Sequence, residues 1–159
     1  MAFSPETGTG SSSANSYIDV AFADTFHSDR GNAAWASADN ASKQAALVKA
    51  TDYLDQTFSF LGERATEAQA LEFPRDYGDG KQPLPAKLKQ ATAVLALEAL
   101  TKDLNPSLSP EGQIKRKKAD VLEKEYFEVK RTVTIRPKIE GLLSGLIPPR
   151  SGNARVVRA

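Results

Sequence analysis

The chain has 159 residues, of which 40% are hydrophobic and 26% are charged, and it contains no cysteine. This length fits one domain, and this composition supports a packed core rather than wholesale disorder. The lack of cysteine excludes disulfides, thiolate catalysis and thiolate metal sites. The longest apolar run, residues 93–97, is far shorter than the ~20 residues of a membrane-spanning helix. Residues 1–6 carry no pattern of an export signal, so neither export nor membrane association is expected.

Charge is divided unevenly along the chain. Residues 1–114 hold nine Lys and Arg against fifteen Asp and Glu, whereas residues 115–159 hold twelve against five. Such polarity is typical of a surface that meets nucleic acid or an acidic partner. It can also place the acidic face of one subunit beside the basic face of the next, as in ring-forming contacts. An ordinary solvated basic face explains the pattern equally well.

Helical signals dominate the first half of the chain. Residues 1–15 are rich in Gly, Ser and Thr and predict a flexible arm. Ser16 is the predicted N-cap of a helix with an apolar stripe that ends at Gly31; the stripe contains Ile18, Phe22 and Phe26. A second helix is predicted from Asp39 to about Thr57, and Trp35 is expected to fill the gap between the two helices.

Residues 58–85 are predicted to be irregular, with a capping-box pattern at Thr66 and Gln69 and a turn-rich run at residues 76–80. A loop of this length in a compact domain is usually functional or forms an interface. The candidate interface residues are Phe73, Pro74, Arg75 and Tyr77.

The second half begins with a helix that Pro85 opens. Residues 91–100 are apolar almost all round, which predicts a buried central helix. The period then changes to two, most clearly over residues 127–135, which favours a strand within an extended segment at residues 113–135. Pro137 restarts a helix that is expected to reach Ile147, where Pro148 and Pro149 end it.

The predicted fold class is therefore mainly α. We expect a small helical bundle around a buried central helix, with a short β-hairpin or extended segment and flexible N- and C-terminal arms. The predicted divisions are an arm at residues 1–15, one helical domain at residues 16–147 and a C-terminal arm at residues 148–159.

The search for catalytic chemistry is negative. His27 is the single histidine, and one histidine without cysteine cannot form a tetrahedral zinc site, so a structural or surface role is expected. Asp76 and Asp79 lack the ligand spacing of a calcium loop. No nucleophile and base can be paired, so we expect no catalytic residues, no cofactor, no metal and no enzyme activity. The basic run at residues 115–118 either grips phosphates or forms an exposed face.

Several segments, taken in order, carry a resemblance that covers residues 5–105 well and the rest more loosely. The segments that carry it are Glu6-Thr7-Gly8-Thr9-Gly10, Ala14-Asn15-Ser16-Tyr17, Ala23-Asp24 with His27, Arg30-Gly31-Asn32, Trp35, Lys43-Gln44-Ala45-Ala46-Leu47, Ala50-Thr51-Asp52-Tyr53-Leu54-Asp55, Gln69-Ala70-Leu71, Phe73-Pro74-Arg75, and Pro85 with Leu88-Lys89-Gln90-Ala91. The chain resembles head–tail connector (adaptor) proteins of long-tailed bacteriophages, which often carry the label of DnaT-like single-stranded-DNA-binding proteins. Where members often have a glycine between two basic-then-apolar segments, this chain has Asp120.

The resemblance implies a structural virion protein, made in the host cytoplasm and located in the neck at the portal vertex. Such subunits form a homo-oligomeric ring, typically of twelve, that extends the DNA channel. The expected partners are the portal protein, a stopper or tail-completion protein, and packaged double-stranded DNA in weak, non-specific contact. The candidate portal-binding residues are Arg150, Arg155, Val156, Val157 and Arg158, and the candidate DNA-channel or intersubunit residues are Lys115, Arg116, Lys117 and Lys118.

The alternative is a single-stranded-DNA-binding protein acting in phage or host replication. Such binding uses aromatic rings on a basic groove. Tyr126 and Phe127 are the aromatic residues of the basic C-terminal third, whereas Phe22, Phe26, Tyr53 and Phe58 lie on helical stripes and are expected in the core. This pattern predicts a poor stacking surface, so the adaptor is the main expectation.

Overall fold

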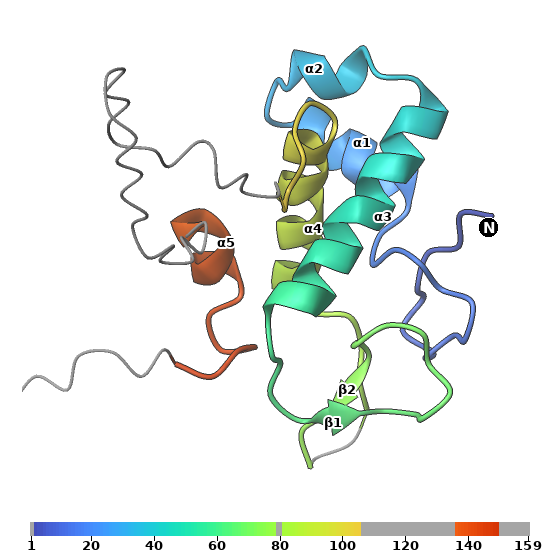
Figure 1. The fold of residues 1–159 in the computed structure, drawn as a ribbon, viewed down its shortest axis with the longest axis vertical. Helices are drawn as coiled ribbons and strands as arrows, with labels where there is room; N and C mark the ends of the chain where they lie inside the picture. Colours follow the sequence, from blue (N-terminus) through green and yellow to red (C-terminus); the bar gives the residue numbers. More distant parts are fainter. Residues whose placement is uncertain (1, 79–80, 106–135, 150–159) are drawn as a thin grey trace, which may run out of the picture.

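The computed structural model describes residues 2–78, 81–105 and 136–149, and it confirms a mostly helical fold (Figure 1). The helices of these residues are α1 (Val20–Ser28), α2 (Ala33–Ala36), α3 (Asn40–Thr57), α4 (Ala86–Ala99) and α5 (Pro137–Leu142). Three short strands, β1 (Glu63–Arg64), β2 (Arg75–Asp76) and β3 (Lys81–Gln82), form an antiparallel sheet in that order. The sheet lies at the end of the molecule opposite α2 (Figure 1). No helix of the described ranges is long and apolar enough to cross a membrane.

Helices α3 and α4 form the centre of the core and run side by side in opposite directions (Figure 1). Half of α4 is buried, and many of those positions are alanine, which lets the neighbouring helices approach closely. Thr92 is buried too, and its hydroxyl donates to the carbonyl of Leu88 one turn earlier, 3.0 Å away. The prediction of a buried central helix is confirmed. The buried residues of α4 are Leu88, Ala91, Thr92, Ala93, Leu95, Ala96 and Ala99.

The start of α1 differs from the sequence prediction. Asp19, not Ser16, is the N-cap, and its carboxylate accepts a hydrogen bond of 2.7 Å from the Phe22 amide. Ser16 is buried, pairs with Pro5 in a short β-bridge, and donates its hydroxyl to the Ile18 carbonyl. Since the Ser16 side chain bonds locally, the chain stays extended there. The predicted start of α3 is confirmed, because Asp39 caps that helix through the Ser42 amide.

The N-terminal segment is organised around one carboxylate. Glu6 is 5% exposed, and its two carboxylate oxygens accept four backbone amides at 2.8–2.9 Å. Gly8 and Gly10 have φ of +94° and +81°, which lets the loop turn around the carboxylate. The Gly- and Ser-rich composition predicts a flexible arm here, but the structure shows a hydrogen-bonded loop. The donors are the amides of Gly8, Thr9, Gly10 and Ser11.

The last described segment is shorter as a helix than predicted. α5 ends at Leu142 rather than near Ile147, and Gly145, with φ of +86°, follows in a turn. Ile139 and Leu143 are buried against the core. The predicted extended segment at residues 113–135 lies outside the described residues, so the sheet seen here is a different one.

Candidate functional site

One face of α1 carries two aromatic rings, and cations from the turn after α1 and from α4 lie beside them. Phe26 is 8% exposed, as expected of a core residue, but Phe22 is 36% exposed, so its predicted core position is wrong. The two rings stack at 6.4 Å between centroids and 17° between planes. Phe22 therefore packs along the helix surface against Phe26 and leaves part of its ring open.

Two cations border these rings. The guanidinium of Arg30 lies over the Phe26 ring at 3.6 Å from its centroid and donates to the Phe26 carbonyl at 2.9 Å. The ammonium of Lys89, on α4, lies 6.0 Å from the centroid of the Phe22 ring. Neither cation forms an ion pair with another described residue. We call Phe22, Phe26, Arg30 and Lys89 the aromatic–basic strip.

A polar network lies beside this strip, between α1, α2 and α3. The Asp24 carboxylate accepts from the Trp35 indole at 2.7 Å and from the Lys43 ammonium at 2.9 Å. These hydrogen bonds, that of Lys43 first, hold the pKa of Asp24 below its usual value. Trp35 is 1% exposed and fills the gap between α1 and α3, as predicted. The network lines an open cavity of about 520 Å³.

His27 is part of the same region and is buried. Its Nε2 lies 3.0 Å from the Ala93 carbonyl, which can only accept, so Nε2 carries the proton. Nδ1 then accepts from the Asn32 amide at 2.9 Å. Burial lowers the pKa of His27, which keeps the ring neutral at pH 7. The prediction of a structural histidine fits this geometry, and the described residues contain no cluster that could hold a metal ion.

Arg75 organises the loop at residues 58–85. It is 8% exposed, and its guanidinium donates to three backbone carbonyls of the preceding segment, to the Glu72 carbonyl at 3.3 Å and to the Glu72 carboxylate at 2.6 Å. Almost all of its donors are therefore used within the subunit. The three carbonyls are those of Phe60, Leu61 and Gly62.

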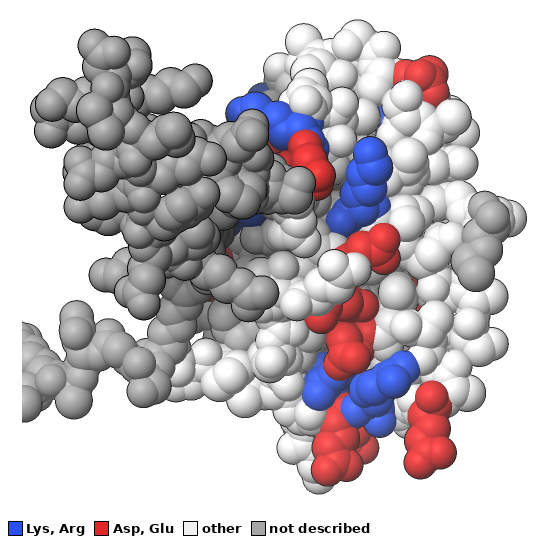
Figure 2. Space-filling view, viewed as in Figure 1, with Lys and Arg blue, Asp and Glu red and all other residues white. Residues whose placement is uncertain are grey.

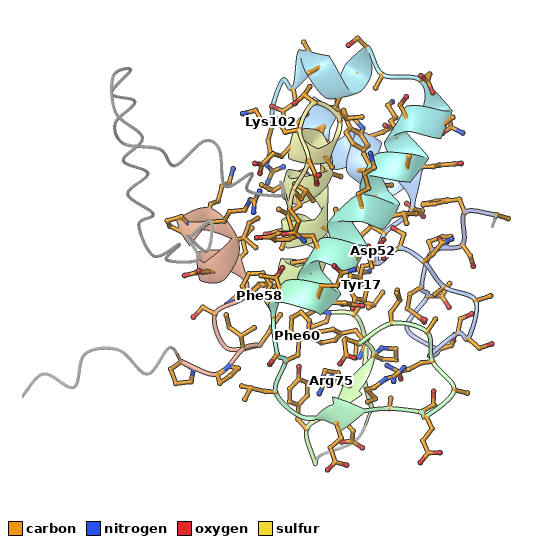
Figure 3. All side chains as sticks on the ribbon, viewed as in Figure 1. Tyr17, Asp52, Phe58, Phe60, Arg75 and Lys102 are labelled. Atoms are coloured by element: carbon orange, nitrogen blue, oxygen red, sulfur yellow. The ribbon has the colours of Figure 1, made fainter. Side chains whose placement is uncertain are left out.

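Most of the candidate interface residues of this loop are buried. Phe73 and Pro74 are fully buried, and Phe73 packs edge-on against Tyr17 and Phe60. With Arg75 also buried, three of the four candidates have a structural role because their side chains face the core. Tyr77, at 37% exposed, is the one that keeps an open surface. Figure 3 shows Arg75 and Phe60 together at the sheet end of the molecule.

A buried acid joins three segments of the chain. The Tyr17 hydroxyl donates to the Asp55 carboxylate, which also accepts from the Glu72 amide. Burial raises the pKa of Asp55 to about 6, and the negative charges of Glu72 and Asp52 add to the effect. Burial and the Asp55 charge also hold the pKa of Tyr17 above its usual value. Sequence reasoning missed this pair, since nothing in the local pattern links positions 38 residues apart.

Arg136 connects the C-terminal segment to α3 and α4. Its guanidinium pairs with Glu98 at 3.2 Å, donates to the Tyr53 hydroxyl at 2.6 Å and to the Leu104 carbonyl at 3.2 Å, and lies over the Tyr53 ring. An open cavity of about 490 Å³ lies nearby, lined by α3 residues and residues 99–105. Asp52 lines it, and partial burial raises the pKa of that carboxyl.

The described surface shows no single-sign patch on the face seen in Figure 2, where Lys and Arg alternate with Asp and Glu. Two predicted sets, the portal-binding and the DNA-channel candidates, lie outside the described residues. They are Arg150, Arg155, Val156, Val157 and Arg158, and Lys115, Arg116, Lys117 and Lys118.

The described residues form a small helical protein with the aromatic–basic strip on its surface. Nearly all of its buried polar side chains form hydrogen bonds within the chain. The family described as "Putative DnaT-like ssDNA binding protein" matches residues 1–159, so the chain belongs to this family. No curated protein and no solved structure matches the chain.

Proposed function

We propose that this protein binds single-stranded DNA. The observation that carries the proposal is the match of its family, described as DnaT-like and single-stranded-DNA binding, over the whole chain. The charge pattern supports it, because residues 115–159 hold twelve Lys and Arg against five Asp and Glu, a basic excess that suits phosphate contacts. The aromatic–basic strip supports it further. Phe22 has an open ring with Lys89 beside it, and Arg30 lies over the adjacent Phe26 ring. Single-strand binding combines base stacking on aromatic rings with phosphate contacts to cations.

The test compares single and double strands at equal length. Fluorescence anisotropy of the full chain with a labelled thymidine oligonucleotide, and with a duplex of the same length, should show tighter binding to the single strand. Affinity should fall steeply with salt, because counterions are released from each neutralised phosphate. Equal affinity for both forms, or no binding to either, would contradict the proposal.

The second candidate is a head–tail adaptor of a phage virion. The resemblance favours it, together with the charge polarity between residues 1–114 and 115–159, which suits head-to-tail contacts between subunits. In this function the protein forms a ring in the neck, binds portal and stopper or tail-completion proteins, and contacts double-stranded DNA weakly. No enzyme activity is proposed for either function.

Assembly experiments separate the two candidates. An adaptor should form rings in native mass spectrometry or on purified portals. Deletion of residues 150–159 should abolish portal attachment and leave the melting temperature nearly unchanged. A full chain that stays monomeric with portals present and prefers single strands would eliminate the adaptor.

A further inference from the structure

We propose that the aromatic–basic strip is where a base of single-stranded DNA stacks, with Phe22 as the stacking ring. The inference rests on the proposed single-stranded-DNA binding and assigns it a location on the described body. Phe22 is 36% exposed, an unusual state for a large aromatic residue in a chain whose other described rings are mostly buried.

The arrangement of the rings prepares Phe22 for a ligand. Phe26 backs it at 6.4 Å with nearly parallel planes, so the Phe22 ring is supported rather than free to collapse onto the core. A base can then add to the stack along the open part of the ring. Base–aromatic stacking tolerates any sequence, because every base has a π-face.

The cations give the site its preference for a nucleic acid over an apolar ligand. Arg30 and Lys89 come from different elements, and each lies beside a different ring of the pair. Arg30 is exposed and uses one nitrogen on the Phe26 carbonyl, which leaves further donors for a phosphate. Asp19 and Asp29 lie close in sequence, and their charges should keep the affinity moderate.

Tyr77 shows why exposure alone does not make such a site. Its ring is as open as that of Phe22, at 37% exposed. However, Arg75, two residues earlier, has its guanidinium engaged by the loop carbonyls and by Glu72. Among the described side chains no cation lies over the Tyr77 ring, whereas Lys89 lies over the Phe22 ring, so Tyr77 is the natural control.

The experiment measures anisotropy of the thymidine oligonucleotide with Phe22→Ala, Phe22→Leu and the matched controls Tyr77→Ala and Leu61→Ala. Loss of one stacked base should weaken binding about 5- to 150-fold in Phe22→Ala. Phe22→Leu keeps the apolar side chain without the ring and should lose most of the same affinity. The controls, which remove equally exposed side chains, should bind like wild type. Arg30→Gln and Lys89→Gln should each lower the slope of log affinity against log salt by roughly 0.7.

Photo-crosslinking of a halogenated oligonucleotide to the full chain gives a direct second measurement. The crosslinked peptide should contain Phe22. If wild type binds but Phe22→Ala and Phe22→Leu bind equally well and the crosslink maps elsewhere, the strip is not the site and single-stranded-DNA binding still stands. If wild type binds no single strand, both the proposed function and this inference fail. Melting curves of each variant show that a loss of binding is not a loss of folding.

Discussion

Arg30 and Arg75 both lie near aromatic rings, but the structure uses them in opposite ways. Arg75 is buried with its donors engaged by carbonyls of its own loop, whereas Arg30 is exposed over the Phe26 ring with donors left over. The sequence suggests the reverse, since Phe73-Pro74-Arg75 predicts an interface and Phe22 and Phe26 predict core. The difference teaches that the availability of donors, rather than residue type, decides which cation can meet a partner.

The largest expected effect is on folding, from Arg75→Ala. The change leaves the carbonyls of residues 60–62, which are buried or partly buried, and both the carbonyl and the carboxylate of Glu72 without their donor. We expect a loss of about 3–5 kcal/mol in the free energy of unfolding, measured by urea denaturation. Arg75→Lys should recover little, because one ammonium cannot reach all of these acceptors. A variant as stable as wild type would show that Arg75 is not a structural residue and would contradict its contrast with Arg30.

Glu6→Ala tests a second buried charge, the Glu6 carboxylate, whose hydrogen bonds are also formed within the subunit. Four backbone amides lose their acceptor, and we expect a loss of about 3 kcal/mol. Burial alone would raise the pKa of Glu6, but the amides of Gly10, Ser11, Gly8 and Thr9 outweigh it and lower that pKa. The stabilisation by Glu6 should therefore be present at neutral pH and decline as the pH falls through its folded pKa. Glu6→Gln, which keeps one acceptor oxygen, should lose less; equal stability of all three proteins would contradict this.

Asp55→Asn should gain stability relative to wild type as the pH rises from 4 to 7, because wild type must then ionise the buried carboxyl and the variant need not. The folded pKa of Asp55 is about 6, above its ordinary 3.8, so the stability of wild type should decline as the pH rises through this window. The difference corresponds to about 2–3 kcal/mol at full ionisation. The measurement is the unfolding free energy of both proteins at pH 4 and pH 7. A difference between them that does not change with pH would contradict the raised pKa.

The smallest expected effect on stability comes from Arg30→Gln, the counterpart of Arg75→Ala. Because Arg30 is exposed, loss of its contact with the Phe26 ring and of its hydrogen bond to the Phe26 carbonyl should lower the free energy of unfolding by only about 1 kcal/mol. Binding of the thymidine oligonucleotide should nevertheless weaken at low salt. A large loss of stability with unchanged DNA binding would show that Arg30 is structural, like Arg75.

The sequence by itself determined the two central helices, α3 and α4. Apolar spacing and capping residues act over a few positions, so Asp39 marks the start of α3, and the apolar run marks α4 as the buried helix. Gly31, with φ of +64°, lies in the turn that follows α1, which itself ends at Ser28, and Trp35 is buried as the sequence predicts.

Only the tertiary structure decided how polar and aromatic side chains are used. Arg75 and the Tyr17–Asp55 pair find partners 13 to 38 residues away in the chain, which folding brings together. Phe22 and Phe26 lie on one helical stripe, yet Phe22 is open and Phe26 is covered, with the Arg30 guanidinium and the rings of Phe22 and His27 beside it. Local periodicity cannot predict such contacts, because they depend on which distant segments of the chain pack against each residue.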